Sequence, residues 1–232
     1  MSNDCLNPRK AKEFFFAKNQ WIIDGAGVVY WPAQQMLIVA DMHLEKASYL
    51  AEQGQVLPLH DTRDTLFRLH SLITDYRPKR LLTLGDNFHD PNALKRMAEP
   101  NKQWLKDICS KVEHTYWVLG NHDKGTVFQA LPNVTFLPKF CFQGLVFSHD
   151  VEAHSSYQIV GHYHPKIYVK AIAGKCLILD DHTMILPAFG SFTGGLDINS
   201  MQFKELTGLR FPKVYMLYKG KVWQVRAMSF DD

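Results

Sequence analysis

Five short apolar segments in this sequence each run directly into a cluster of aspartate, asparagine or histidine residues. Aliphatic and β-branched runs of this kind, bounded by glycine or turn residues, are typical of buried strands. Because binding sites in α/β sheets lie just beyond the carboxyl ends of strands, we expect the clusters to meet along one sheet edge and to form a metal centre there. The clusters are Asp41-Met42-His43, Gly85-Asp86-Asn87, Gly120-Asn121-His122-Asp123, Ser148-His149-Asp150 and Gly161-His162-Tyr163-His164.

Two carboxylates, one amide and four imidazoles in these clusters make a set of candidate metal ligands. One divalent ion does not need so many ligands, whereas two ions roughly 3.5–4 Å apart that share a bridging carboxylate would use them all. Oxygen donors mixed with imidazole suit manganese, iron or zinc and argue against calcium, and the absence of cysteine argues against a structural zinc site. The set is Asp41, His43, Asp86, Asn121, His149, His162 and His164.

His122 follows a candidate ligand directly, and successive residues of an extended segment point apart. Asn121 would then face the metal while His122 faces the substrate, where it would protonate a leaving oxygen. Asp123 is expected to hold the His122 ring in one orientation, as a carboxylate does for a catalytic histidine. Taken singly, each of these motifs arises by chance and a lone histidine is more often structural, so the prediction depends on the whole ordered set.

In this order the motifs resemble those of the calcineurin-like metallophosphoesterase superfamily, over positions 41–164. The stretches 39–47, 85–89 and 186–195 further resemble one branch, the ligase-associated DNA-damage-response endonucleases of bacteria, and extend the resemblance over nearly the whole chain. The resemblance implies an α/β fold, a two-sheet β-sandwich flanked by helices, with the metal site at the C-terminal ends of strands. We expect residues 1–232 to form a single domain.

Position by position, the resemblance implies two groups of ligands and one residue shared between them. Asp86 would bridge both ions and His122 would be the acid beside the leaving group. The first ion would be held by Asp41, His43 and His164, and the second by Asn121, His149 and His162.

Two residues depart from the pattern of these relatives. Many superfamily members have aspartate three residues after the bridging Asp86, where this chain has His89, and the branch often has glycine at the place of Glu45. His89 is therefore a candidate substrate contact. Lys46 is a second one, as a phosphate contact at the mouth of the site, with a solvated side chain as the alternative.

Periodicity and turn residues predict the remaining elements. Leucines at near-helical spacing predict an amphipathic helix over 59–75, and a helix-rich region split by Pro100 follows 90–92. The strand-rich second half would supply the second sheet, with hairpin turns at 173–175 and 219–221. The glycines of 190–195 are interpreted as a tight loop that needs positive φ, and close approach of the backbone to ligands or substrate is the alternative.

Composition limits the partners. A net charge of +3 permits nucleic-acid binding without requiring it, and Lys46 with the Lys95-Arg96 pair would have to supply the contacts, although the basic region after 92 also fits a solvated helix face. The four cysteines show no CxxC spacing and are typical of free thiols. No secretory signal pattern and no apolar run near the ~20 residues of a membrane span are seen, so we expect a cytoplasmic protein without membrane partners.

The expected function is hydrolysis of phosphodiester bonds by a metal-bridging hydroxide, with two divalent ions as cofactors, Mn²⁺ first and Fe or Zn as alternatives. The branch resemblance implies a DNA-repair nuclease or phosphodiesterase that acts on DNA with an ATP-dependent DNA ligase and a helicase as partners. Small phosphodiesters, nucleotides and phosphoproteins remain open as substrates. The alternative class is a metal-bound scaffold in a protein assembly, and the sequence leaves the oligomeric state open.

Overall fold

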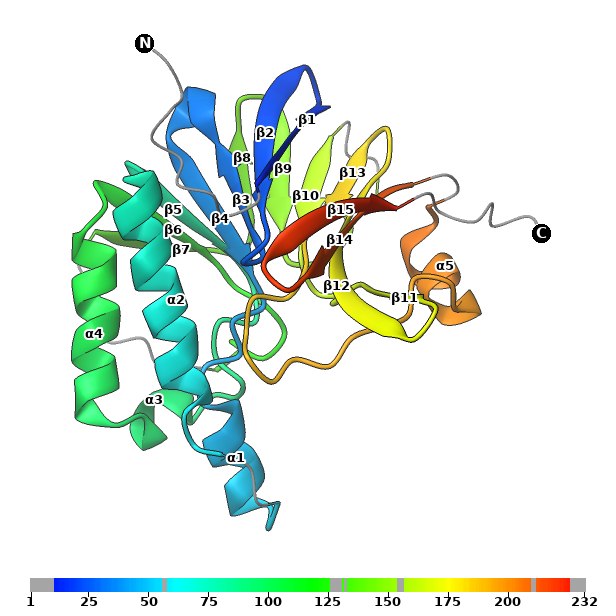
Figure 1. The fold of residues 1–232 in the computed structure, drawn as a ribbon. Helices are drawn as coiled ribbons and strands as arrows, with labels where there is room; N and C mark the ends of the chain where they lie inside the picture. The colour runs from blue at the N-terminus through cyan, green and yellow to red at the C-terminus, as the bar shows by residue number, and fades with distance from the viewer. Residues whose placement is uncertain are drawn as a thin grey trace.

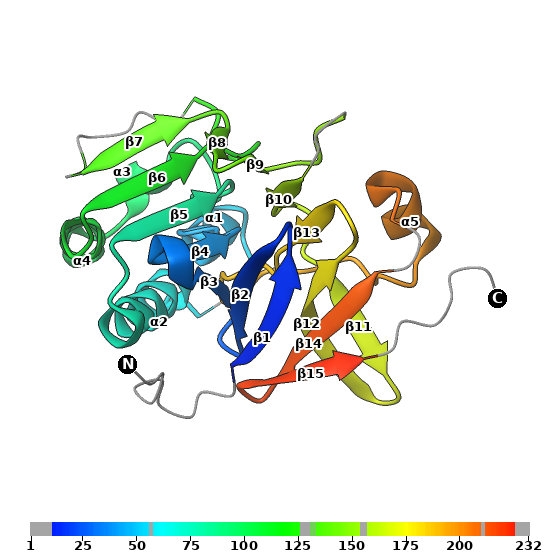
Figure 2. The same ribbon diagram turned by 90° about the horizontal axis from the view of Figure 1, so that it is seen from above.

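The structure is a computed structural model, and it describes residues 11–55, 58–125, 131, 133–153, 157–209 and 212–225. Within these residues two β-sheets pack face to face and helices cover their outer faces, as Figure 1 and Figure 2 show. The expected two-sheet α/β sandwich flanked by helices is confirmed.

The first sheet follows the order of the chain, and its second half is parallel. Neighbouring strands are antiparallel from β1 to β4 and parallel from β4 to β7, so the carboxyl ends of β4, β5 and β6 lie at one edge. The strands are β1 (Lys12–Phe16), β2 (Asn19–Asp24), β3 (Val28–Trp31), β4 (Met36–Ala40), β5 (Arg80–Leu84), β6 (His114–Val118) and β7 (Val134–Leu137). The predicted motif strands before Asp41, Asp86 and Asn121 are β4, β5 and β6.

The second sheet has the order β15-β14-β12-β13-β10-β9-β8, with β11 paired to β12. Only its centre, β9, β10 and β13, is parallel. The strands are β8 (Phe140–Phe142), β9 (Leu145–Ser148), β10 (Gln158–Val160), β11 (Lys166–Val169), β12 (Ile172–Leu179), β13 (Thr183–Ile185), β14 (Lys213–Tyr218) and β15 (Lys221–Val225). Strands β9 and β10 precede the His149 and His162 motifs.

Strand β4 shows why the strands of this fold are apolar on both faces. All five of its residues are buried, and because successive side chains point to opposite faces, the strand contributes to two cores. Ile38 and Ala40 belong to the core between the sheets, whereas Leu37 and Val39 belong to the core beneath the helices. A central strand that is buried on both faces is apolar at every position, so its sequence shows no alternation of apolar and polar residues.

The helices cover the outer faces of the two sheets. Helices α2 and α4 pack on the first sheet and α5 on the second (Figure 1). The helix predicted over 59–75 is α2, and Pro100 lies in the first turn of α4, where its missing N–H costs no hydrogen bond. The helices are the 3₁₀ turn η1 (Pro32–Gln34), α1 (Lys46–Glu52), α2 (Asp61–Tyr76), α3 (Ala93–Arg96), α4 (Glu99–Ser110) and α5 (Met201–Thr207).

One of the two predicted hairpin turns is misplaced. The 219–221 turn is confirmed, because Lys219 and Gly220, which separate β14 from β15, both have positive φ. The 173–175 turn is wrong: Gly174 lies inside β12, where a Cβ would meet the Leu217 carbonyl oxygen at 2.7 Å. The chain instead turns at Lys170, whose φ is 55°. The turn prediction was wrong because Gly174 allows close packing inside a strand and does not form a turn.

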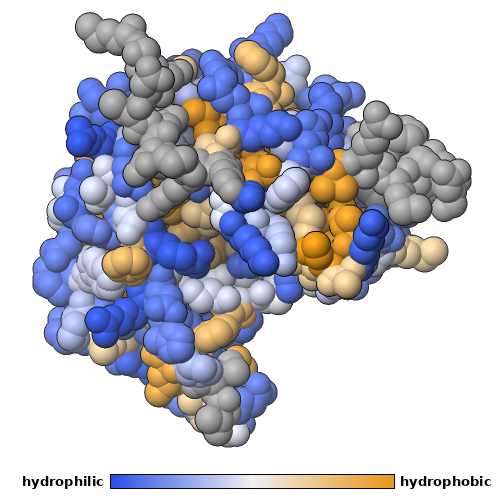
Figure 3. Space-filling view, viewed as in Figure 1, coloured by the Kyte–Doolittle hydropathy of each residue, from blue (hydrophilic) through white to orange (hydrophobic). Residues whose placement is uncertain are grey.

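The face of the molecule in Figure 3 is mostly hydrophilic, with hydrophobic residues in scattered spots. No helix among the described residues is long and apolar enough to cross a membrane.

Candidate metal centre

The five polar clusters meet where the carboxyl ends of both parallel regions come together. Asp41 and Asp86 follow β4 and β5 in the first sheet, and His149 and His162 follow β9 and β10 in the second. Backbone hydrogen bonds continue past the strand ends, from the Asp41 N–H to the Gly85 carbonyl (3.2 Å) and from the Gly161 N–H to the His149 carbonyl (3.2 Å). The expectation that the clusters share one edge is confirmed.

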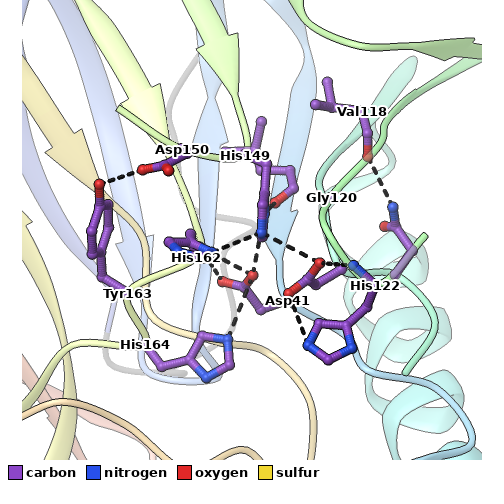
Figure 4. A network of polar contacts seen from close by, with 12 residues as sticks. Asp41, Val118, Gly120, His122, His149, Asp150, His162, Tyr163 and His164 are labelled. Carbon is purple, nitrogen blue, oxygen red and sulfur yellow. Dashed lines mark hydrogen bonds and ion pairs between the residues drawn. The ribbon is translucent and has the colours of Figure 1, made fainter. Parts of the chain in front are cut away.

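Asp41, His43 and His164 form the first group of donors. One ligand atom from each lies within 4.8 Å of the others. The Nε2 atoms of His43 and His164 are 3.2 Å apart, and His164 Nε2 lies 3.5 Å from Asp41 Oδ1. Asp41 and His43 are buried, and Figure 4 shows Asp41 and His164 side by side. We call these residues the Asp41 group.

Asp86, His149 and His162 form the second group, called the Asp86 group here. His149 Nε2 lies 3.3 Å from Asp86 Oδ1 and 3.0 Å from His162 Nδ1. Figure 4 shows His162 beside the His149 ring, with a dashed line between them.

The Asp86 carboxylate lies between the two groups. Its Oδ1 faces His149 in its own group, and its Oδ2 lies 3.8 Å from His43 Nε2 in the other. Each oxygen therefore points to a different set of imidazoles, which is the arrangement that a bridging carboxylate needs.

Asn121 is placed beside Asp86 by its two neighbours. A Cβ on Gly120 would lie 2.1 Å from the Asp86 backbone nitrogen, and the His122 N–H donates to Asp86 Oδ1 at 2.9 Å. The residues before and after Asn121 therefore both contact Asp86, which keeps Asn121 close to the bridging carboxylate. The Asn121 residue itself is exposed.

A third cluster joins His89 and His122 to His43. The His89 and His122 rings stack with centroids 5.1 Å apart and an interplanar angle of 18°, and His89 Nδ1 lies 3.3 Å from His43 Nδ1. The two candidates for substrate contact and acid catalysis therefore lie side by side at the open side of the Asp41 group.

The orientation of the His122 ring comes from a backbone carbonyl. His122 Nδ1 lies 2.6 Å from the His89 carbonyl oxygen, and because a carbonyl only accepts, this assigns the proton to Nδ1. Nε2 then remains for the substrate side, 3.9 Å from Asp86 Oδ2, and the side chain is 44% exposed. Such a ring is accessible to a leaving group and fixed in tautomer.

The prediction that Asp123 orients His122 is wrong. The Asp123 carboxylate is buried and accepts hydrogen bonds from the backbone N–H groups of Gly120, Asn87 and Phe88 and from the Asn87 side chain, at 2.9 to 3.2 Å. It therefore joins the loop that carries Asp86 to the loop that carries His122. The sequence signal was ambiguous because a carboxylate beside a histidine fits either role.

Of the cations nominated for nucleic acid, Lys46 is the one near the ligands. Lys46 is the first residue of α1. Burial lowers its pKa, although the negative charge of Asp61 acts in the other direction. The Lys46 charge in turn helps to lower the pKa of His89, so the two side chains are close. Arg96 instead pairs with Asp90 and with Glu52, and only 13% of its side chain is exposed. Its guanidinium therefore joins α3 to α1 and to the loop between β5 and α3.

The charge distribution of the centre fits a bound cation. Burial lowers the pKa of His43 to about 2, and its neighbour His164 adds to the effect, so this ring is a neutral donor. Burial would raise the pKa of Asp86, but the hydrogen bond and charge of His149 lower it, so the carboxylate is ionised. Burial would lower the pKa of His149, but the bond to Asp86 and the charge of Asp41 raise it to about 9, so the carboxylates hold a proton on this ring that a bound cation would replace. Ionised carboxylates and closely opposed imidazole nitrogens are the donors that Mn²⁺, Fe and Zn²⁺ prefer.

Backbone strain is concentrated on the candidate ligands. Left-handed conformations cost a non-glycine residue roughly 1–2 kcal/mol and persist where the surroundings impose them. Packing around these residues is tight, because a Cβ on Gly85 would meet the His149 ring and one on Gly161 would meet Asp41. The ligands with positive φ are Asp41 (51°), His43 (43°), Asp86 (45°), His162 (69°) and His164 (45°).

A tyrosine that the sequence reasoning passed over ties two ligand loops together. The Tyr163 hydroxyl donates to Asp150, so the residue between His162 and His164 holds the residue that follows His149 (Figure 4). The signal was present in the motifs, since both partners lie inside them.

Comparison with known proteins agrees with this geometry. The model of the calcineurin-like phosphoesterase family matches residues 35–221. The fold is similar to the crystal structure of the Pseudomonas putida nuclease MPE, with a TM-score of 0.74 and 24% sequence identity over 93% of this chain and 100% of that one. No match was found among the curated proteins. The structural likeness, at this identity, shows the fold, and the family model, which spans most of the sequence, shows that the chain belongs to the calcineurin-like phosphoesterases.

Proposed function

We propose that this metal-dependent phosphoesterase holds two divalent ions and hydrolyses the phosphodiester bonds of DNA. The observation that carries the two-ion proposal is the position of Asp86, with one carboxylate oxygen toward each ligand group. Asp41, His43 and His164 would hold one ion, Asn121, His149 and His162 the other, and Asp86 both. Mn²⁺ is the proposed ion, with Fe or Zn as alternatives, because the donors mix carboxylate and amide oxygens with imidazole.

When bound, such a pair of ions supplies a water-derived nucleophile and neutralises charge on the phosphate. The protein's own contribution is proton transfer and positioning. The His89 carbonyl fixes His122 Nδ1–H, so a protonated ring directs its Nε2–H to the departing oxygen. The His89 ring stacks on His122 and is the second imidazole that we propose to contact the phosphate.

Support for a nucleic-acid substrate comes from two sources. The similar solved structure is a nuclease by its title, and the motif resemblance includes bacterial DNA-repair endonucleases. Lys46 and His89 lie on the same side of the centre as His122 and are the proposed contacts for the phosphate backbone. We further propose an ATP-dependent DNA ligase and a helicase as partners, which co-purification from cells would test.

A cytoplasmic location is part of the proposal. Cys109, Cys141 and Cys176 are free thiols, as expected in a reducing compartment.

The test is a substrate panel with Mn²⁺-loaded protein: single- and double-stranded DNA, RNA, bis-p-nitrophenyl phosphate, a phosphomonoester and a phosphopeptide. Asp86→Asn, which keeps the shape of the side chain but removes its charge, is the matched control for adventitious nuclease. We expect metal-dependent cleavage of DNA by the wild type and none by the variant. Turnover restricted to the phosphomonoester or phosphopeptide would overturn the DNA assignment. Metal binding without turnover of any substrate would favour a scaffold.

A further inference from the structure

Residues 188–195, called the brace here, connect the second sheet to the end of β4. Ala188 forms a parallel bridge with Ala40, the Phe189 N–H donates to the Ala40 carbonyl (2.8 Å), and the Gly190 N–H donates to the Asp41 carbonyl (3.0 Å). The brace therefore pairs with β4 at the point where the strand gives way to its metal ligands.

Two glycines of the brace touch the backbone of two ligand loops. A Cβ on Gly190 would lie 2.3 Å from the Met42 carbonyl oxygen, between Asp41 and His43, and a Cβ on Gly195 would lie 2.3 Å from the His164 carbonyl oxygen. Neither glycine has positive φ, so the interpretation of a tight loop that needs positive φ is wrong and the alternative of close approach holds. Gly194, between them, has open space around its Cβ position.

Two basic side chains, one from each sheet layer, hold the brace in place. Lys175 of β12 donates through Nζ to the carbonyls of Ala188 (2.7 Å) and Gly190 (2.8 Å). Arg68 of α2 donates to the Phe189 carbonyl (2.6 Å), and its guanidinium lies over the Phe189 ring at 4.4 Å. Three successive carbonyls are thus held by donors from two basic side chains.

The contacts of the brace are selective for one ligand group. Among the described residues, its hydrogen bonds and glycine contacts reach the backbone of Ala40, Asp41, Met42 and His164 directly, and none reaches Asp86, His149 or His162. The Asp86 group has supports of its own: Gly85 against the His149 ring, and Tyr163 bonded to Asp150.

We propose that the brace, held by Lys175 and Arg68, positions the Asp41 group alone, so that it sets the affinity for one of the two ions and leaves the other unchanged. Lys175 and Arg68 are positioning residues, since they act on the ligands through the backbone of 188–190. The inference rests on the two-ion proposal above. Loss of partners behind metal ligands typically costs about 10–100-fold in metal affinity.

The three glycines provide the experiment. Mn²⁺ is titrated by calorimetry into metal-free wild type, Gly190→Ala, Gly195→Ala and the matched control Gly194→Ala. We expect two ions in the wild type and in the control. Gly190→Ala and Gly195→Ala should each keep one ion at wild-type affinity and bind the other about 10–100-fold more weakly. Equal weakening of both ions, or of neither, would overturn the inference, whereas a wild type that binds fewer than two ions would overturn the two-ion proposal itself.

Double variants identify which ion is affected. His164→Ala removes a ligand of the Asp41 group and His149→Ala removes one of the Asp86 group. Gly190→Ala should add nothing to His164→Ala, because residues that act on one site are not additive. In His149→Ala it should weaken the remaining ion about 10–100-fold, as it does in the wild type. The reverse pattern would show that the brace acts on the Asp86 group and would overturn the inference.

Lys175→Met gives a test that leaves the glycines intact. It keeps the aliphatic stem and removes the donor, and Lys213→Met, on the neighbouring strand β14 and exposed, is its control. We expect Lys175→Met to replace the electron paramagnetic resonance signal of a coupled manganese pair by that of an isolated ion at limiting Mn²⁺. A coupled signal equal to that of Lys213→Met would count against the role of Lys175. Circular dichroism of metal-free protein checks folding, and Gly195→Ala and Lys175→Met decide the matter if Gly190→Ala does not fold.

Discussion

Replacement of Asp123 separates a structural carboxylate from a catalytic one. The side chain is 2% exposed and accepts four hydrogen bonds, so Asp123→Ala leaves four buried donors without an acceptor. An unsatisfied buried donor costs about 1–3 kcal/mol, which would sum to about 4–12 kcal/mol if the losses were additive. Water entry and coupling among neighbours reduce this, and we expect about 3–5 kcal/mol, as for other broken buried networks.

A loss of that size is measurable. For a chain of 150–250 residues, 1 kcal/mol shifts the melting temperature by about 2–4 °C, so Asp123→Ala should melt about 6–20 °C below the wild type. Asp123→Asn keeps one oxygen acceptor and turns an NH₂ group toward a donor, so we expect roughly half of the loss. Urea unfolding of metal-free protein, followed by tryptophan fluorescence, gives both values.

The control is His122→Ala, which removes an exposed ring and should leave the free energy of unfolding within about 0.5 kcal/mol of the wild type. If Asp123 instead oriented His122, Asp123→Asn would keep wild-type stability and metal content while the pH dependence of kcat changed. That result would refute the structural role.

Three further predictions concern the chemistry. His122→Ala should keep its metal ions and lose about 10²–10⁴-fold in kcat on DNA, but much less on bis-p-nitrophenyl phosphate, whose leaving group needs little protonation; equal losses on both would indicate positioning instead. Asp86→Ala should lose both ions, and full occupancy by elemental analysis would contradict the bridging role. Lys46→Met in a His122→Ala background should make the log–log salt dependence of single-stranded DNA binding shallower by roughly 0.7 while metal content is unchanged; an unchanged slope would exclude Lys46 as a phosphate contact.

The positions of the ligands followed from the sequence because strand ends are local features. An apolar run that stops at Asp41 or Asp86 marks both the end of a strand and the start of a loop at a sheet edge. Helix α2 was equally predictable, since its buried Leu66, Leu69 and Leu72 repeat at helical spacing.

What the sequence could not give are the partners that lie far along the chain. Either Asp123 or a backbone carbonyl could orient His122. The path of the loop after β5 brings the His89 carbonyl to the ring and turns Asp123 toward the Phe88 N–H. The sequence around Lys175 does not indicate its role, because the carbonyl oxygens that it binds, at 188 and 190, belong to another segment. Gly174 was misassigned for the same reason, since its close neighbour is Leu217.

Both ligand groups take residues from both sheets, and this couples metal uptake to assembly of the sandwich. A chain in which only the first sheet had formed would offer Asp41, His43 and Asp86, but not His149 or His164, the latter 121 positions beyond His43. Ions at this centre would therefore bind the docked sheets and have little affinity for separated ones. At 100 times the dissociation constant, one such ion stabilises the docked form by about 2.7 kcal/mol. Bound ions would then hold the two sheets together, and release of the ions would accompany separation of the sheets.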